Sequence, residues 1–204
     1  MELSILRNYL SKIKTKFIEE HIKNKTASQG EYSEDVKSYC ILAHANIEHY
    51  FEIAAETIML NSINIYEKEK KITVPLFALV IYKTKKTGRK DINQSLYDIS
   101  RILLNEIKSE FSTYIRTKNH GINIRCMENL FMPIGIDLKF IEQEPDLKSS
   151  LEKLSMERGC YAHRIIQRVI SPEDAVKCIE DCVRVCEEIE KLKNEIIGVI
   201  PAQN

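Results

Sequence analysis

The chain has 204 residues, of which 44% are hydrophobic and 29% charged, with only six glycines and five prolines. This composition predicts one well-ordered, mainly helical domain and excludes a chain dominated by disorder. Thirty basic residues balance thirty acidic ones, so no overall field draws the molecule to nucleic acid or to an anionic membrane. Any phosphate binding must therefore be local.

The N-terminal segment is amphipathic and charged, unlike a secretory signal. Its apolar residues recur with a period near 3.6, which predicts a first helix from residue 2 to about 24. These residues are Leu3, Leu6, Leu10, Ile13, Phe17 and Ile18. No segment reaches the roughly 18 apolar residues that span a bilayer. We therefore expect a cytoplasmic protein without a membrane partner.

A long second helix is expected to start at Ser33, because Glu34 and Asp35 follow this candidate N-cap. One apolar stripe supports it as far as about residue 62. The stripe consists of Val36, Cys40, Ala43, Ile47, Phe51, Ala54 and Ile58.

Residues 63–94 give a weaker signal, because Pro75 interrupts an apolar run. A short helix after Pro75 and an extended segment both fit this pattern. The basic run "KTKKTGRK" at 83–90 could hold phosphate, but a solvated loop is the preferred interpretation.

The second half of the chain is predicted to be helical again. The expected elements are a helix at 94–118, a short helix at 127–132, the turn "PIGID", a helix that starts at Pro145, and a last helix that starts after Ser171. The predicted fold class is therefore an all-α bundle, with short extra segments between the second and third helices. We expect one domain over 1–204, with an N-terminal helix and linker at 1–32 and a core bundle at 33–197.

Six cysteines raise the question of metal or redox chemistry, since Cys178, Cys182 and Cys186 recur every fourth residue. No CxxC pair and no nearby histidine accompany them. Their apolar helical setting predicts that the cysteines are thiols that serve as small core residues.

The stretch "AHANIEHYFE" places His44, Glu48 and Glu52 four residues apart on one helical face. A metal site there would lack the Glu-x-x-His or His-Glu-x-x-His patterns of known helical sites. Solvated ion pairs along the helix are the other interpretation. We keep Glu48 as a candidate functional residue, and His44 and His49 as structural or surface groups.

The stretch "RGCYAH" contains Arg158 and His163, five residues apart. On a regular helix these positions diverge by about 140°. They can converge if the helix loosens near Gly159, or if a second copy faces the first across a two-fold axis. Tyr161 and Arg164 add a hydroxyl and another charge nearby.

This motif resembles the Arg-x(4–6)-His signature of the HEPN superfamily, which is commonly written Arg-Asn-x-x-x-His. "AHANIEHYFE" looks like the early helix of the RiboL-PSP-HEPN subgroup, and "NHGINIRCMENLFMPIGID" is similar to the segment before its motif helix. The resemblance covers roughly residues 33–195. Gly159 departs from the usual polar residue of the motif.

The resemblance implies a helical domain that forms a homodimer and cleaves RNA without a metal ion or other cofactor. Arg158 and His163 take the motif roles, Glu48 orients one of them, and Tyr161 and Arg164 help to hold RNA. Such proteins serve as toxins or effectors in prokaryotic antiphage defence, or in toxin–antitoxin systems, with an antitoxin or a sensor protein as a further partner. Neither DNA nor a membrane is expected as a partner.

Chemistry gives these assignments independent support, because the 2′-hydroxyl of RNA is its own nucleophile. Histidine exchanges protons near neutral pH, and arginine offers a charged fork that matches phosphate oxygens. The competing hypothesis is an inactive HEPN module for protein interaction or RNA binding, in which Arg158 forms an ion pair with Glu157 or Glu48. A metal-dependent enzyme based on His44, Glu48 and Glu52 is a third hypothesis.

Overall fold

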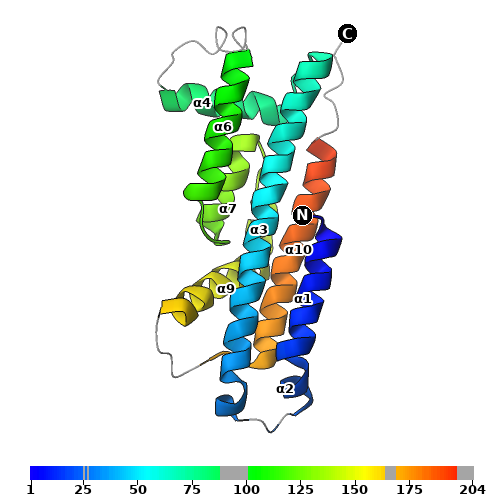
Figure 1. Ribbon diagram of the computed structural model, residues 1–204, viewed down its shortest axis with the longest axis vertical. Coiled ribbons are helices and arrows are strands. Elements are labelled where there is room, and N and C mark those ends of the chain that lie inside the picture. Colours follow the sequence, from blue (N-terminus) through cyan, green and yellow to red (C-terminus); the bar gives the residue numbers. More distant parts are fainter. Residues whose placement is uncertain (25, 27, 88–100, 164–168, 197–204) are drawn as a thin grey trace. The chain divides into compact units, whose positions relative to one another are not determined.

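The computed structural model describes residues 1–204 except 25, 27, 88–100, 164–168 and 197–204, and omits the side chains at 84, 86, 87, 101–103, 162, 163 and 196. The described residues form helices and turns without a strand, which confirms the all-α prediction (Figure 1). None of these helices combines the length and apolar character that crossing a bilayer requires.

The chain divides into two units. Unit 1 consists of Met1–Phe51, Gly121–Arg125 and Lys139–Glu188, and unit 2 of Glu52–His120, Cys126–Leu138 and Ile189–Asn204.

The longest helix, α3 (Gln29–Glu69), contributes to both units. Its predicted apolar stripe is confirmed, since all seven residues are at most 4% exposed. The two ends of α3 differ from the prediction. Ser28, and not Ser33, precedes the first turn, and its backbone N–H donates to the Glu31 carboxylate. The sequence "SQGE" therefore shows the glutamate half of a capping box, and it begins the helix five residues early.

The other end of α3 lies beyond the expected residue 62, because the helix continues to Glu69. Lys70 then adopts a left-handed backbone conformation with φ 58°, and its N–H donates to the Tyr66 carbonyl at 2.9 Å. This conformation commonly ends helices, but glycine or asparagine usually adopts it. A lysine in this place gave no signal in the sequence.

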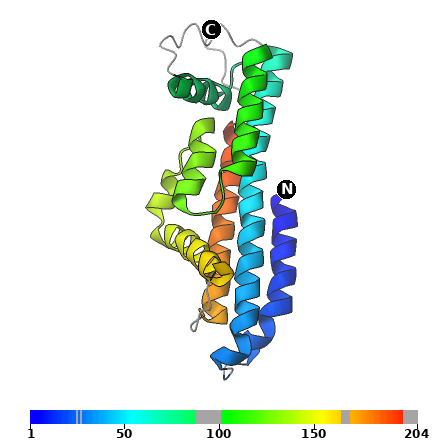
Figure 2. The ribbon, with the colours of Figure 1, turned by 60° about the vertical axis from the view of Figure 1, so that its left-hand side comes forward.

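The predicted first helix is broken into α1 (Leu3–Phe17) and α2 (Glu19–Lys23). The break occurs at Ile18, which is fully buried and has a non-helical φ of −122°. In unit 1, α1 lies beside α3 and α10 (Pro172–Ile196) in both views (Figures 1 and 2). Ion pairs join α1 to α10, with Arg7 and Lys14 bonded to Glu187 and Glu180 at 2.5 and 3.0 Å.

The ambiguous segment after residue 63 contains α4 (Val74–Thr87), so its helical interpretation is the correct one. Thr73 lies before this helix, and its hydroxyl accepts a hydrogen bond from the Leu76 N–H at 3.4 Å. The prediction of a solvated loop at 83–90 is wrong for Lys83. Lys83 belongs to α4 and pairs with Glu106 and Glu110 of α6 (Arg101–Thr117), while 88–90 lie outside the described residues.

The rest of the chain follows the predicted order of elements. Its elements are α7 (Ile124–Phe131), the 3₁₀ helix η1 (Met132–Ile134), α8 (Lys139–Gln143), α9 (Pro145–His163) and α10. Helix α7 starts three residues earlier than expected, however, and α8 was not predicted. Ser171 caps α10 as expected, since its hydroxyl accepts the Asp174 N–H at 3.1 Å. Of the helix predicted at 94–118, residues 94–100 lie outside the described part.

The predicted core role of the cysteines is confirmed for four of them. Cys178, Cys182 and Cys186 of α10 are buried, as is Cys40 of α3, and burial raises the pKa of the Cys186 thiol well above its usual range. The core prediction is wrong for the other two cysteines. Cys126 and Cys160 are only partly buried.

Two glycines allow a matched test of the backbone conformation, one in a left-handed turn and the other inside a helix. Gly135 has a φ of 75°, and an added Cβ would lie 3.1 Å from the Ala78 side chain and 3.3 Å from Val74. Gly159 lies inside α9, and an added Cβ there meets nothing within 4 Å. We expect Gly135→Ala to lower the free energy of unfolding by about 1–2 kcal/mol. Gly159→Ala should raise it by about 0.5–1 kcal/mol.

Urea denaturation measures both changes. A Gly135→Ala variant as stable as the native protein would contradict the strained turn, and a destabilised Gly159→Ala variant would contradict the helical backbone at Gly159.

Candidate functional site

The motif helix α9 continues through Gly159 and ends at His163. The helix therefore does not loosen at Gly159, and positions 158 and 163 lie about 140° apart around it. Arg158 follows the buried stripe of Leu147, Leu151 and Leu154 by one further turn, yet its side chain is exposed.

Position 163 lies on a different face of α9 from Arg158. It lies about 20° around the helix from position 156, by the count of 100° per residue. Met156 is 60% exposed, so its own side chain is directed to solvent. The side chain of His163 lies outside the described part of the structure, and Arg164 lies wholly outside it.

His44 of α3 is a buried histidine, with only 3% of its surface exposed. Burial is the main cause that lowers its pKa from 6.5 to about 4, and the positive charge of Arg158 lowers it further. The imidazole is therefore neutral at pH 7. Its Nδ1 lies 3.6 Å from the Glu48 Oε2 atom, which is longer than a hydrogen bond. Because the imidazole is uncharged, this contact is not a salt bridge at neutral pH.

The effect on His44 also locates Arg158, since a charge changes a pKa in this way only from nearby. The guanidinium of α9 thus lies close to the polar part of α3. No hydrogen bond or ion pair joins Arg158 to another residue of the described part. The ion pair with Glu157 or Glu48, which the hypothesis of an inactive module requires, is absent among these residues.

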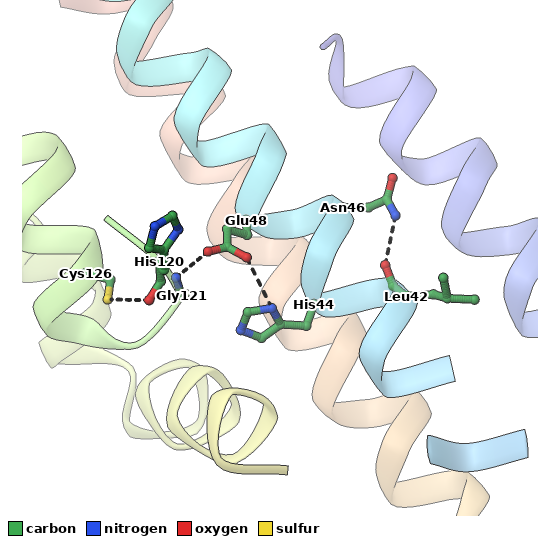
Figure 3. A network of polar contacts seen from close by, with 7 residues as sticks. All are labelled: Leu42, His44, Asn46, Glu48, His120, Gly121 and Cys126. Carbon is green, nitrogen blue, oxygen red and sulfur yellow. Dashed lines mark hydrogen bonds and ion pairs between the residues drawn. The ribbon is translucent and has the colours of Figure 1, made fainter. Parts of the chain in front are cut away.

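Glu48 holds the loop before α7 (Figure 3). Its Oε1 atom accepts a hydrogen bond from the Gly121 backbone N–H. Gly121 has a φ of 125°, a conformation that favours glycine over any residue with a side chain. A second carboxylate, Glu152 of α9, accepts the Ile124 N–H at 3.0 Å. Carboxylates from α3 and α9 therefore fix this loop at both ends.

Tyr161 has a structural contact near the end of α9. Its hydroxyl accepts the Ile170 backbone N–H at 3.5 Å and hydrogen-bonds the Glu157 side chain. Burial, followed by the bond to Glu157, raises the pKa of this phenol above its usual value, so it stays protonated. The hydroxyl thus connects α9 with the residues before α10.

The structure places Glu48 3.6 Å from His44, and the charge of Arg158 acts on the same histidine. The sequence predicts a structural or surface role for His44, although its four-residue spacing from Glu48 is visible there. Gly121 had no signal, because it is 73 residues from Glu48 in the chain.

The metal hypothesis gains no support from the described residues. Among them, no three or more histidine, cysteine, aspartate or glutamate side chains are placed to hold a metal ion.

The arrangement provides an exposed cation beside a buried, neutral imidazole and a carboxylate whose position is fixed. A guanidinium in this setting can bind a phosphate and stabilise extra negative charge on it. His44 is too buried to reach a substrate, so proton transfer needs another group.

Comparison with known proteins identifies one family. The family model RiboL-PSP-HEPN matches residues 4–194. No curated protein and no solved structure matches the chain.

The lowered pKa of His44 predicts that stability falls at acid pH. Between pH 6.5 and about 4 the unfolded chain binds a proton at this residue that the folded chain excludes, so stability decreases as pH falls through this range. The full effect of His44 is about 3 kcal/mol. We expect His44→Leu to remove this part of the pH dependence in urea denaturation.

Equal pH dependence in native protein and His44→Leu would contradict the neutral, buried imidazole.

The proximity of Arg158 to His44 makes a second prediction. Arg158→Ala removes a positive charge that disfavours protonation, so the pKa of His44 should rise. NMR titration of the His44 ring measures this shift. Lys148→Ala, which removes an exposed cation from the same helix, should cause no shift. An unchanged pKa in Arg158→Ala would place Arg158 away from this site.

Proposed function

Because the chain belongs to the RiboL-PSP-HEPN family, we propose that it is a metal-independent endoribonuclease of the HEPN type. In this proposal it acts in the cytoplasm as a toxin or effector, in prokaryotic antiphage defence or in a toxin–antitoxin system. One observation carries the proposal most directly. The motif arginine, Arg158, is exposed and unpaired among the described residues, and its charge acts on a buried neutral histidine beside Glu48.

The proposed reaction uses the 2′-hydroxyl of RNA as the nucleophile. A neutral His163 accepts the 2′-proton as the oxygen attacks the adjacent phosphorus, and the bond from phosphorus to the 5′-oxygen breaks. A protonated His163 from a second copy gives a proton to that 5′-oxygen. Arg158 stabilises the extra negative charge on the phosphorane. The products are a 2′,3′-cyclic phosphate and a 5′-hydroxyl.

Glu48 acts in this proposal as a positioning residue. Its hydrogen bond to Gly121 and its contact with His44 favour a role in positioning Arg158, without direct contact with RNA. Tyr161 and Arg164 keep their proposed role in holding RNA. For Tyr161 the bonds to Glu157 and Ile170 favour contact through the ring, because the hydroxyl is occupied.

A homodimer is part of the proposal, because one continuous helix directs positions 158 and 163 about 140° apart. A second copy supplies the missing group at each reacting phosphate. The solvent-directed side chain of Met156 and the open space at Gly159 support such a contact. An antitoxin or sensor protein that restrains the nuclease is a further proposed partner.

The second candidate function is an inactive HEPN module that binds RNA or another protein. Gly159 favours it, because glycine replaces the polar residue that commonly follows the motif arginine. In this case the protein binds RNA through Arg158 but does not cut it.

Cleavage of RNA by the purified protein tests the proposal. We expect cleavage that persists in EDTA and falls at least about 100-fold in both His163→Ala and Arg158→Ala. His49→Ala and Lys148→Ala are matched controls that remove an exposed histidine and an exposed lysine, and they should keep native activity.

Two results would overturn the assignment. Loss of cleavage on addition of EDTA indicates metal-dependent chemistry, and equal cleavage by native protein and His163→Ala indicates that another residue transfers the proton. RNA binding without cleavage by the native protein supports the inactive module.

A further inference from the structure

A polar hollow in unit 1 lies beside the motif helix. It has a volume of about 510 Å³ and is lined by residues from the start of α3, from α9 and from the start of α10. This volume is within the range of about 300–1,000 Å³ that is common for small-molecule sites. The hollow therefore has room for a ligand of nucleotide size. A second hollow, of about 160 Å³, continues it along α9 and α10, and the two share Lys153 and Asp174.

The shared lysine is a candidate phosphate ligand. No ion pair joins Lys153 to another described residue, although it is only partly exposed. Its charge acts on the buried thiols of Cys40 and Cys178, so the ammonium lies near the interior of unit 1. Lys177, which lines the second hollow, adds another cation. A partly buried cation without a carboxylate partner is suited to an anionic ligand group.

One part of the wall is suited to a flat ring. Tyr32 lines the hollow, together with the apolar residues Val169 and Ile170. A nucleobase stacks on an aromatic side chain, with a contribution of about 1–3 kcal/mol per base in single-stranded nucleic acids. An aromatic residue and a lysine in one cavity match the two ends of a nucleotide.

The acidic residues of the wall restrict which base fits. Glu157 and Asp174 both line the hollow, so a ligand with several phosphates is repelled, and one phosphate is the most that Lys153 and Lys177 together offset. Ionised carboxylates only accept hydrogen bonds, and each has two oxygens. Guanine offers two neighbouring donors, the ring N1–H and the 2-amino group, which match one carboxylate. Asp174 has an unpaired side chain among the described residues, whereas Glu157 is bonded to Tyr161.

We infer that this hollow binds one guanosine monophosphate unit, with the phosphate at Lys153, the base beside Tyr32 and the guanine edge at Asp174. A divalent metal ion is not the ligand that we expect in this hollow, because no group of three metal ligands occurs among the described residues. An apolar helix of another protein is not the expected occupant either, since a lysine and carboxylates line the hollow.

The position on α9 connects this hollow with the candidate site. Glu157 lines the hollow, and Arg158 is the next residue. If the chain is the proposed endoribonuclease, on which this step depends, the bound unit is a nucleotide of the RNA close to the phosphate held by Arg158. Otherwise the unit is a free nucleotide.

Calorimetric titration of the full chain with guanosine monophosphate, inosine monophosphate and inorganic phosphate tests the inference. We expect guanosine monophosphate to bind at least about tenfold more tightly than inosine monophosphate, which lacks the 2-amino group. Lys153→Ala should weaken guanosine monophosphate binding about tenfold or more. Lys148→Ala, on the same helix outside the hollow, should leave it unchanged. Asp174→Asn should remove the difference between the two nucleotides while both still bind, whereas a loss of folding would abolish the binding of both.

Steady-state RNA cleavage separates the two sources of the ligand. If the hollow holds a nucleotide of the substrate, guanosine monophosphate competes with RNA, and Lys153→Ala raises KM with kcat unchanged. If it holds a free nucleotide, guanosine monophosphate changes kcat without competing.

The inference is overturned if guanosine monophosphate binds no more tightly than inorganic phosphate, or if Lys153→Ala and Lys148→Ala bind it equally well. The proposed function survives that outcome when cleavage still depends on Arg158. Conversely, nucleotide binding that depends on Lys153 in a protein that cuts no RNA supports the hollow and overturns the nuclease.

Discussion

Burial of one face of α3 is the constraint on which the rest of the structure depends. The apolar stripe from Val36 to Ile58 is almost completely excluded from water, which fixes the rotation of this long helix about its axis. Because that rotation is fixed, His44 and Glu48 each have one available direction. His44 enters the interior as a neutral imidazole, and Glu48, at the edge, reaches the Gly121 N–H. The polar site thus follows from hydrophobic packing, with two polar side chains placed at the border of the stripe.

Local patterns predicted most of the helices, because helical periodicity and capping residues act over a few residues. The stripe of α3, the start of α9 at Pro145 and the Ser171 cap of α10 were all predicted in this way. The errors at the ends of α3 have two different causes. The "SQGE" signal at Ser28 is present in the sequence and competes with Ser33, whereas the left-handed Lys70 has no residue-type signal.

The contacts within the candidate site were not predictable from local patterns. The bond from Glu48 to Gly121 joins residues that are far apart in the chain, and the effect of Arg158 on His44 joins α9 to α3. Such contacts depend on how helices pack, which periodicity alone does not give. The spacing of Arg158 and His163 left two alternatives, a helix that loosens near Gly159 and a second copy of the motif. The continuous α9 excludes the first, since a regular helix separates the two positions.

In the proposed function, two copies of the chain together form one RNA-cleaving site. The most direct measurement is sedimentation equilibrium of the protein, combined with RNA cleavage over the same range of protein concentrations. We predict that the active particle has twice the mass of one chain, and that cleavage per chain falls as dilution separates the copies. Full cleavage activity per chain in a particle with the mass of a single chain would contradict the claim.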